Sequence, residues 1–209
     1  MRALITGANR GIGAALLCEG TSRGHDVSGI SRSGRDLARL DVTDPGSQAR
    51  VAEAAGPLDL LVCNAGVYLD RGRGLADLDS ATFADTFAVN VTGIALTIQA
   101  HLRNLSDGGR IAIVASAMGR QSADGGDAFV YRASKAAAVN LALNLAVALR
   151  GRGIAVAAFH SGWVSSDMGG AAAPVSPAVS ARGLWDRFEA LDLASTGSFL
   201  NHDGTPLDP

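Results

Sequence analysis

A tyrosine and a lysine four residues apart, Tyr131 and Lys135, are the residues of this chain whose types and spacing most directly suggest chemistry. Residues at i and i+4 share one face of a helix, so the lysine ammonium can stand near the phenol and lower its pKa from about 10 toward the working pH. A tyrosine tuned in this way is a usable general acid. By itself such a pair is more often an ordinary exposed helix contact, so its surroundings must decide.

Ser116 is the first of those surroundings. It follows an apolar run, residues 111–115, that is typical of a buried strand, and it precedes a helix predicted over residues 129–150. A serine hydroxyl at the end of a strand can hold a carbonyl oxygen while the tyrosine protonates it. These three residues together favour the reduction of a carbonyl group.

A glycine-rich turn near the start of the chain is the second motif that bears on the role of the Tyr131–Lys135 pair. Residues 6–13 read Thr-Gly-Ala-Asn-Arg-Gly-Ile-Gly and lie between a predicted strand and a predicted helix. Glycines in that position let the backbone approach a pyrophosphate at the helix N-terminus, although a plain strand-to-helix turn is the alternative. The candidate cofactor contacts in the turn are Gly7, Asn9, Arg10, Gly11, Ile12 and Gly13.

The spacing of this turn resembles the cofactor signature of the short-chain dehydrogenase/reductase (SDR) family, and further motifs follow in the family's order. The resemblance adds as cofactor contacts Asp41 and Val42 at the adenine, Asn64, Ala65 and Gly66 at the ribose side, and Gly162, Trp163, Val164 and Ser166 near the nicotinamide. It implies that Tyr131 is the acid, Ser116 the oxygen anchor, Lys135 the ribose ligand and pKa modulator, and Asn90 part of a proton relay to water.

Several of these residues have a plainer reading. Asp41 could cap the next helix, Asn64 could satisfy backbone groups at a strand end, Asn90 could be a hydrogen-bonded core amide, and Trp163 could be a packing residue. The last motif also departs from the family pattern, because Ser161 replaces its proline and Ser166 its threonine.

Cofactor preference is expected from the residues after the second strand. A carboxylate there binds a ribose 2′-hydroxyl, whereas an arginine accommodates a 2′-phosphate. Ser31 and Arg32 occupy this place, Arg10 can face the same phosphate, and Arg35 is an additional candidate. NADP(H) is therefore expected rather than NAD(H), unless these arginines are only solvated surface charges.

Finer details resemble the sniffer and C-factor-like carbonyl reductase branch of the family, among them Gly125-Gly126 before Tyr131 and the segment 167–170, Asp-Met-Gly-Gly. That resemblance implies NADPH-dependent reduction of an aldehyde or ketone to an alcohol. The alternatives are an alcohol dehydrogenase or a dedicated biosynthetic ketoreductase of the same family, and an NADP-binding signalling or sensor protein without significant turnover.

The elements that must position these residues alternate along the chain. Strands are predicted over residues 3–5, 27–30, 37–40, 58–63, 111–115, 154–159 and 198–200, and helices over residues 11–23, 81–105, 129–150 and 178–191. This alternation predicts an α/β fold, a single Rossmann-type domain over residues 1–209 with a doubly wound parallel sheet. Residues 31–41 leave no room for a crossover helix, so the helix between strands 2 and 3 is expected to be missing.

Composition limits the partners. The net charge of −2 and the pI near 6.0 give no basic surface for nucleic acid, and no uninterrupted apolar run reaches the length of a membrane span. Scattered histidines and two cysteines predict neither a metal site nor a disulfide. We expect a cytoplasmic protein, possibly a homo-oligomer, that acts on a small carbonyl or alcohol.

Overall fold

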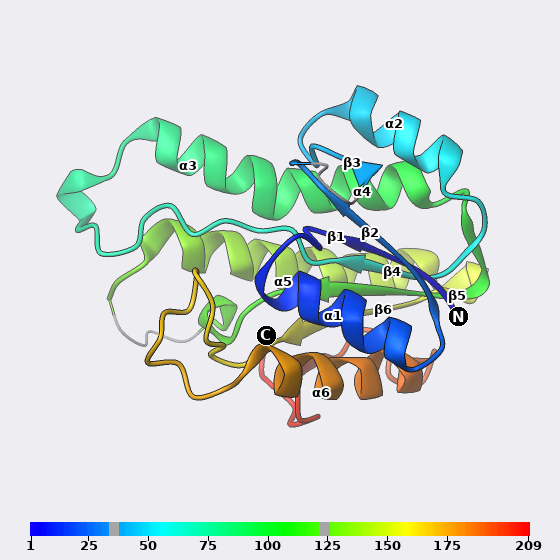
Figure 1. Ribbon diagram of the computed structural model, residues 1–209. Coiled ribbons are helices and arrows are strands. Elements are labelled where there is room, and N and C mark those ends of the chain that lie inside the picture. The colour runs from blue at the N-terminus through cyan, green and yellow to red at the C-terminus, as the bar shows by residue number, and fades with distance from the viewer. Residues whose placement is uncertain (34–37, 122–125) are drawn as a thin grey trace.

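The computed structural model describes residues 1–33, 38–121 and 126–209, and its centre is a seven-stranded parallel sheet (Figure 1). The strand order is β3-β2-β1-β4-β5-β6-β7. From β1 the sheet first extends through β2 to β3, and the chain then crosses to the other side of β1, where β4 to β7 follow. The strands are β1 (Arg2–Thr6), β2 (Asp26–Ser31), β3 (Ala38–Arg39), β4 (Leu58–Cys63), β5 (Leu105–Val114), β6 (Ala155–His160) and β7 (Phe199–Asn201). This is the predicted Rossmann-type doubly wound order, in which ligands bind where the order reverses.

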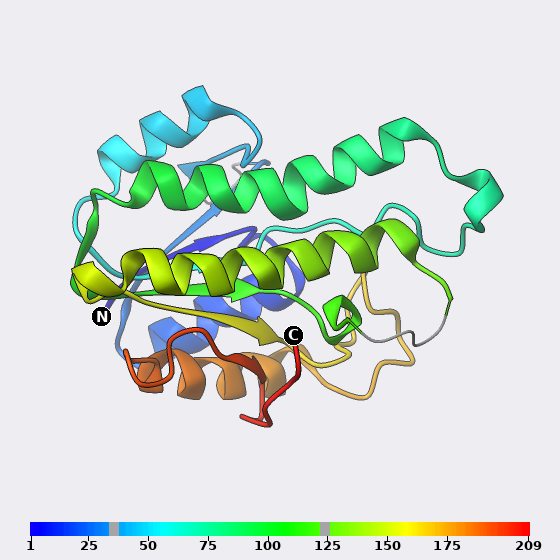
Figure 2. The same cartoon turned by 180° about the vertical axis from the view of Figure 1, so that it is seen from behind.

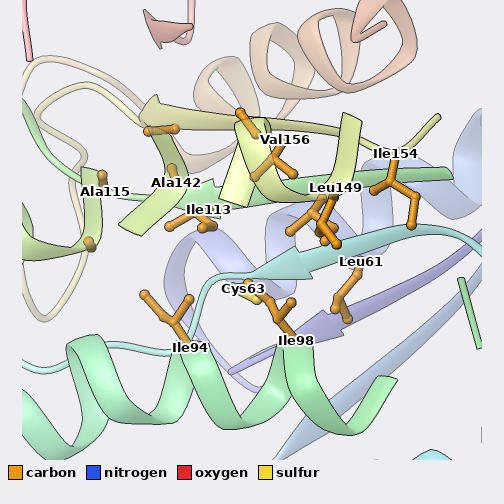
Figure 3. Close-up of a cluster of buried hydrophobic side chains, with 14 of the residues drawn as sticks. Leu61, Cys63, Ile94, Ile98, Ile113, Ala115, Ala142, Leu149, Ile154 and Val156 are labelled. Carbon is orange, nitrogen blue, oxygen red and sulfur yellow. The ribbon is translucent and has the colours of Figure 1, made fainter. Parts of the chain in front are cut away.

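Helices cover the sheet on both faces. On one face α1 (Gly11–Ser22) lies beside α6 (Pro177–Ala190), and on the other α4 (Gly93–His101) and α5 (Phe129–Leu149) lie side by side with α2 (Pro45–Ala54) outside α4 (Figures 1 and 2). Each face therefore has its own core. Trp185, Phe188 and Leu16 fill the first, and Ile94, Ile98, Leu61 and Val156 belong to the second (Figure 3).

The helix predicted over residues 81–105 is interrupted and shorter. It runs as α3 (Ser80–Phe87), a π-helical turn (Ala88–Thr92) and α4, and the chain then turns so that Leu105 begins β5. The predicted apolar stripe also fails at its start, because Phe83 is 42% exposed. Figures 1 and 2 show that the α3 end projects past the sheet, so the strands do not cover it.

The same helical run, Ser80–His101, is long and apolar enough to cross a membrane by length and composition, with a hydropathy of 1.3. Core helices of soluble proteins pass the same test. Here Ile94 and Ile98 are buried against the sheet (Figure 3), so the apolar residues of α4 belong to the core.

The edge formed by β2 and β3 is thinly covered. β3 pairs in parallel with β2 through Ile30–Ala38 and Ser31–Arg39, and only residues 32–37 connect the two strands, which is too few for a crossover helix. Both residues of β3 are exposed, whereas β4 is buried along nearly its whole length. Of the predicted strand 37–40, residue 37 lies outside the described residues.

At the opposite edge, the C-terminal segment folds back along β7. The Asn201 amide donates to the Thr205 carbonyl (2.8 Å), the Leu207 amide donates to the Phe199 carbonyl (2.9 Å), and Leu200 forms an antiparallel bridge with Pro206. The outer side of β7 is therefore hydrogen-bonded by the chain's own tail.

Candidate active site

The glycine turn joins β1 to α1 and is built by close backbone contacts. Gly7 has a φ of +68°, and a Cβ there would lie 2.9 Å from the Ala65 Cα. A Cβ on Gly13 would lie 2.1 Å from the Gly7 carbonyl oxygen and 2.6 Å from the Asn64 amide nitrogen. Neither position has room for a side chain, so both glycines are required for the turn to lie against the end of β4.

Asn64 ties the ends of β1 and β4 together. Its side-chain amide donates to the carbonyls of Thr6 (2.9 Å) and Gly7 (3.2 Å), and its backbone amide donates to the Thr6 hydroxyl (3.0 Å). The plainer reading of Asn64, satisfaction of backbone groups at a strand end, is therefore confirmed. Because these bonds hold the carboxyl ends of β1 and β4 together, Asn64 also shapes the cleft that opens there.

A cavity of about 310 Å³ opens at the carboxyl ends of β1, β2, β4 and β5. This volume lies within the usual range for a small-molecule site, ~300–1,000 Å³. Most of the predicted cofactor contacts line it: Gly7, Asn9, Arg10, Gly11, Ile12, Gly13, Ser31, Arg32, Asp41, Val42, Asn64, Ala65, Gly66, Tyr131, Lys135 and Ser166. Gly162, Trp163 and Val164 are not among its lining residues.

Tyr131 and Lys135 lie in the first turns of α5 and reach the wall of this cavity from a buried position. The Ser116 side chain acts on the Tyr131 phenol in the direction of a lower pKa, and the Lys135 ammonium donates to the Val114 carbonyl (2.9 Å). Ser116 is itself fixed, because its oxygen accepts from the Met118 amide (3.2 Å). The predicted serine, tyrosine and lysine are thus brought together.

The predicted lowering of the Tyr131 pKa by Lys135 is wrong for the protein alone. Burial raises the pKa of Tyr131 to about 12, because a phenolate loses its hydration there, and the Ser116 side chain opposes this only in part. Burial also lowers the pKa of Lys135 to about 8, and its Nζ lies 5.7 Å from the centre of the Tyr131 ring. Tyr131 is therefore a neutral phenol at neutral pH, the form that can donate a proton.

Asn90 occupies the π-helical turn and is completely buried. Its Oδ1 accepts from the Val67 amide (2.8 Å), and its Nδ2 donates to the Val67 carbonyl (2.9 Å) and to the Ser134 hydroxyl (3.0 Å). These bonds agree with the alternative interpretation of Asn90 as a hydrogen-bonded amide in the core. The π-turn interrupts the helix at this residue, a distortion that is common at functional sites.

Arg10 and Arg32, which are expected around a 2′-phosphate, both line the cavity. Arg10 forms an exposed ion pair with Asp167 (2.9 Å), which connects the glycine turn to the segment after β6. Arg32 lines the cavity beside Ser31, whereas Arg35 lies outside the described residues. Asp41 does not cap the next helix, since Asp44 does so, and its carboxylate accepts instead from Thr43, which holds the Asp41 pKa below its usual range.

The segment after β6 forms part of the cavity wall. The Ser166 hydroxyl accepts from the Gly169 amide (3.1 Å), and the Trp163 indole donates to the Gly169 carbonyl (2.8 Å). Trp163 is 56% exposed, so the packing role considered for it does not hold. Its ring lies on the outside of this segment and not against the core.

The structure adds residues that the sequence did not single out, all in the loop after β4. The ring of Tyr68 stacks on that of Tyr131 at 4.4 Å between centroids, and the Arg71 guanidinium lies 5.9 Å from the centre of the Tyr68 ring. Asp70 is 1% exposed and accepts from backbone amides at the start of α5. Local patterns could not reveal these contacts, because their partners are distant in the chain.

A doubly wound parallel sheet with a glycine turn and a tyrosine–lysine pair in one cleft defines a Rossmann-type oxidoreductase. The family model for short chain dehydrogenases matches residues 1–175. The chain belongs to this family, as the motifs indicated, and to the branch with C-signal and the carbonyl reductases.

Individual relatives agree with that placement. C-signal of Myxococcus xanthus is 38% identical over 157 residues, 73% of this chain and 93% of that protein. A 1-hydroxy-2-glutathionyl-2-methyl-3-butene dehydrogenase of Rhodococcus sp. (strain AD45) is 31% identical over 98% of this chain and 97% of its own. Among solved structures, the NADPH-bound carbonyl reductase from chicken fatty liver superposes with a TM-score of 0.89 at 26% identity, covering 100% of this chain and 98% of that one.

Proposed function

We propose that this protein is an NADPH-dependent carbonyl reductase that converts an aldehyde or ketone to an alcohol. The observation that carries the proposal is the placement of Tyr131 and Lys135 on the wall of the same cavity as the glycine turn, with Ser116 close enough to the phenol to affect its pKa. A proton donor and a dinucleotide site that share one cleft are the two requirements of this reaction.

The residues divide the work of the reduction. The phenol of Tyr131 donates a proton to the carbonyl oxygen, while NADPH, when bound in this cleft, would supply the hydride to the carbonyl carbon, so that a C=O group would become a CH–OH group. Ser116 holds the oxygen beside the phenol. Lys135 holds a ribose hydroxyl with its ammonium, which at neutral pH is mostly charged because its pKa is about 8. Asn90 fixes the start of the relay that returns a proton to Tyr131.

The shape and charge of the cavity support NADP(H) as the cofactor. Gly7 and Gly13 leave a turn with bare backbone where a pyrophosphate fits, and Arg10 and Arg32 add two arginines to the lining of the same cavity. The NADPH-bound carbonyl reductase with which the chain superposes has the same architecture.

Both cysteines, Cys18 and Cys63, are free thiols, which supports a cytoplasmic location.

A panel of carbonyl compounds tests the proposal. Diketones, quinones, aromatic aldehydes and simple ketones are offered with NADPH and separately with NADH, and oxidation of the cofactor is followed by absorbance. We expect turnover of at least one class with NADPH and at least about tenfold lower kcat/KM with NADH. Binding of NADPH without turnover of any compound would instead favour a sensor, and faster oxidation of alcohols would favour a dehydrogenase working in the other direction.

A further inference from the structure

The helix that carries Tyr131 begins in an unusual way. α5 starts immediately after Ala128, which is buried and has a φ of 51° in the left-handed region, where residues other than glycine are uncommon. Alanine has no side chain that can accept from the first amides of the helix. Val130 and Tyr131 are both buried, so their amides need acceptors from elsewhere in the protein.

Asp70 supplies those acceptors from the loop after β4. Its Oδ2 accepts from the Val130 amide (2.7 Å), and its Oδ1 accepts from the Tyr131 amide (3.2 Å). Within the described parts of the chain no arginine or lysine forms an ion pair with this buried carboxylate. Its charge is instead held by the positive end of the helix and by these amides.

The loop that carries Asp70 is fixed on both sides of Tyr68. At one side Val67 exchanges two hydrogen bonds with Asn90, and at the other Asp70 holds the first turn of α5. Between these anchors the Tyr68 ring stacks on the Tyr131 ring with only 20° between their planes. The backbone and the side chain of Tyr131 are therefore both held by the short segment 67–70.

Other helices show that stability alone does not require such an arrangement. α2 and α3 are capped by the residue that directly precedes each of them, Asp44 and Asp79. Asp70 reaches α5 from a loop 60 positions earlier in the chain, so it fixes the helix relative to the end of β4 and to the glycine turn. An ordinary cap does not do this.

We propose that Asp70 is a positioning residue, whose carboxylate holds the first turn of α5 and thereby sets the phenol of Tyr131 where it can donate its proton to the carbonyl oxygen of the substrate. This inference rests on the proposed reductase function. A displacement of about 1 Å at a reacting group can lower a rate about a hundredfold, so the effect of losing this contact is measurable.

The test compares D70N and D70A with D79N, which alters a helix cap outside the site. Asparagine keeps one acceptor and removes the charge, whereas alanine removes both. NADPH binding is measured by fluorescence titration, and kcat is expressed per NADPH-binding site. We expect kcat per site to fall about tenfold in D70N and about a hundredfold in D70A, with the Kd for NADPH within about twofold of the wild type. D79N should lower the melting temperature but leave kcat per site unchanged.

The outcomes separate this inference from the function on which it rests. If D70N and D70A keep kcat per site within about twofold, or lose NADPH binding in the same proportion as kcat, Asp70 is only a structural cap and the inference is rejected. If D70A does not fold, D70N alone still decides, because an unchanged kcat per site in D70N rejects the charge-dependent role. Should Tyr131→Phe retain full activity, the proposed reductase mechanism fails whatever the Asp70 variants do.

Discussion

The two ends of the cavity are built in opposite ways. At the proposed catalytic end, defined here as Ser116, Tyr131 and Lys135, every side chain is buried. At the proposed adenosine end, defined as Arg10, Arg32 and the residues of β3, the side chains are exposed, and the connection between β2 and β3 has too few residues for a crossover helix.

The difference follows from what each end must do. Proton transfer requires atoms held within a fraction of an ångström, and burial provides that precision. Recognition of a phosphate requires charge, which acts over longer distances and tolerates mobile, exposed side chains. A protein of this class can therefore shorten its sheet at the adenosine end without disturbing the residues that carry the chemistry.

Tyr131→Phe should have the largest effect, because it removes only the proton donor. We expect kcat/KM for carbonyl reduction to fall about a thousandfold, within the usual contribution of a general acid. The Kd for NADPH should stay within about twofold, since the ring and its stacking with Tyr68 remain. Steady-state kinetics and a binding titration measure both quantities, and turnover near the wild-type rate would remove Tyr131 from the mechanism.

Lys135→Met should lower kcat about a hundredfold and change the pH dependence of stability. Lys135 is the only lysine in the sequence, and burial lowers its pKa in the folded protein to about 8 from the usual 10.5. Between these values the unfolded chain binds a proton that the folded chain does not, so the free energy of unfolding should rise from pH 8 to pH 10.5. Urea titrations across this range should show a smaller rise in the variant; equal slopes would contradict the lowered pKa of Lys135 in the folded protein.

Replacement of both Arg10 and Arg32 by serine tests the adenosine end. If these two exposed guanidinium groups hold the 2′-phosphate as proposed, kcat/KM with NADPH should fall about 10- to 100-fold. With NADH it should change by no more than about threefold, because the catalytic end is untouched. A parallel loss with both cofactors would show that the arginines act on the fold or on the pyrophosphate and not on the 2′-phosphate.

His101→Leu should have the smallest effect of these changes. It tests whether a buried polar group outside the cavity affects the pH dependence of stability. His101 lies at the end of α4, fully buried, and neither ring nitrogen has a hydrogen-bond partner in the described structure. Burial lowers its pKa to about 4, so between pH 6.5 and 4 the unfolded chain binds a proton that the folded chain does not, and stability falls as the pH falls.

The leucine variant should therefore be more stable than the wild type by about 1–2 kcal/mol near pH 5, with a smaller difference near pH 7. Chemical denaturation at the two pH values gives the comparison. A difference that does not grow on acidification would mean that His101 finds a partner or a proton in the folded state.

Much of the fold could be predicted because its signals are local. The strand over residues 58–63 was predicted with its observed limits, and the glycine turn, Ser116 and the α5 pair follow from spacing within short segments. The long helix was predicted less well. Its apolar periodicity continues through the π-turn and past His101, and nothing in that pattern indicates that α3 extends beyond the sheet, where Phe83 stays 42% exposed.

The parts of the site that could not be predicted depend on contacts between distant segments. Asp70 has no local signature, since its partners are the amides of Val130 and Tyr131. The direction of the Tyr131 pKa shift also depends on the depth of burial and not on the spacing from Lys135. Spacing can place two groups on one helix face, but it cannot say how much water either group retains.

The two edges of the sheet bear on how readily this protein aggregates at high concentration. An edge strand with free amides and carbonyls is a template on which another chain can add a strand and begin to aggregate. Within the described residues, β3 offers two residues at one edge, and at the other the bonds from residues 205–207 already occupy the outer side of β7. The short β2–β3 connection thus leaves one face of the sheet thinly covered, yet it leaves little edge on which misassembly could start.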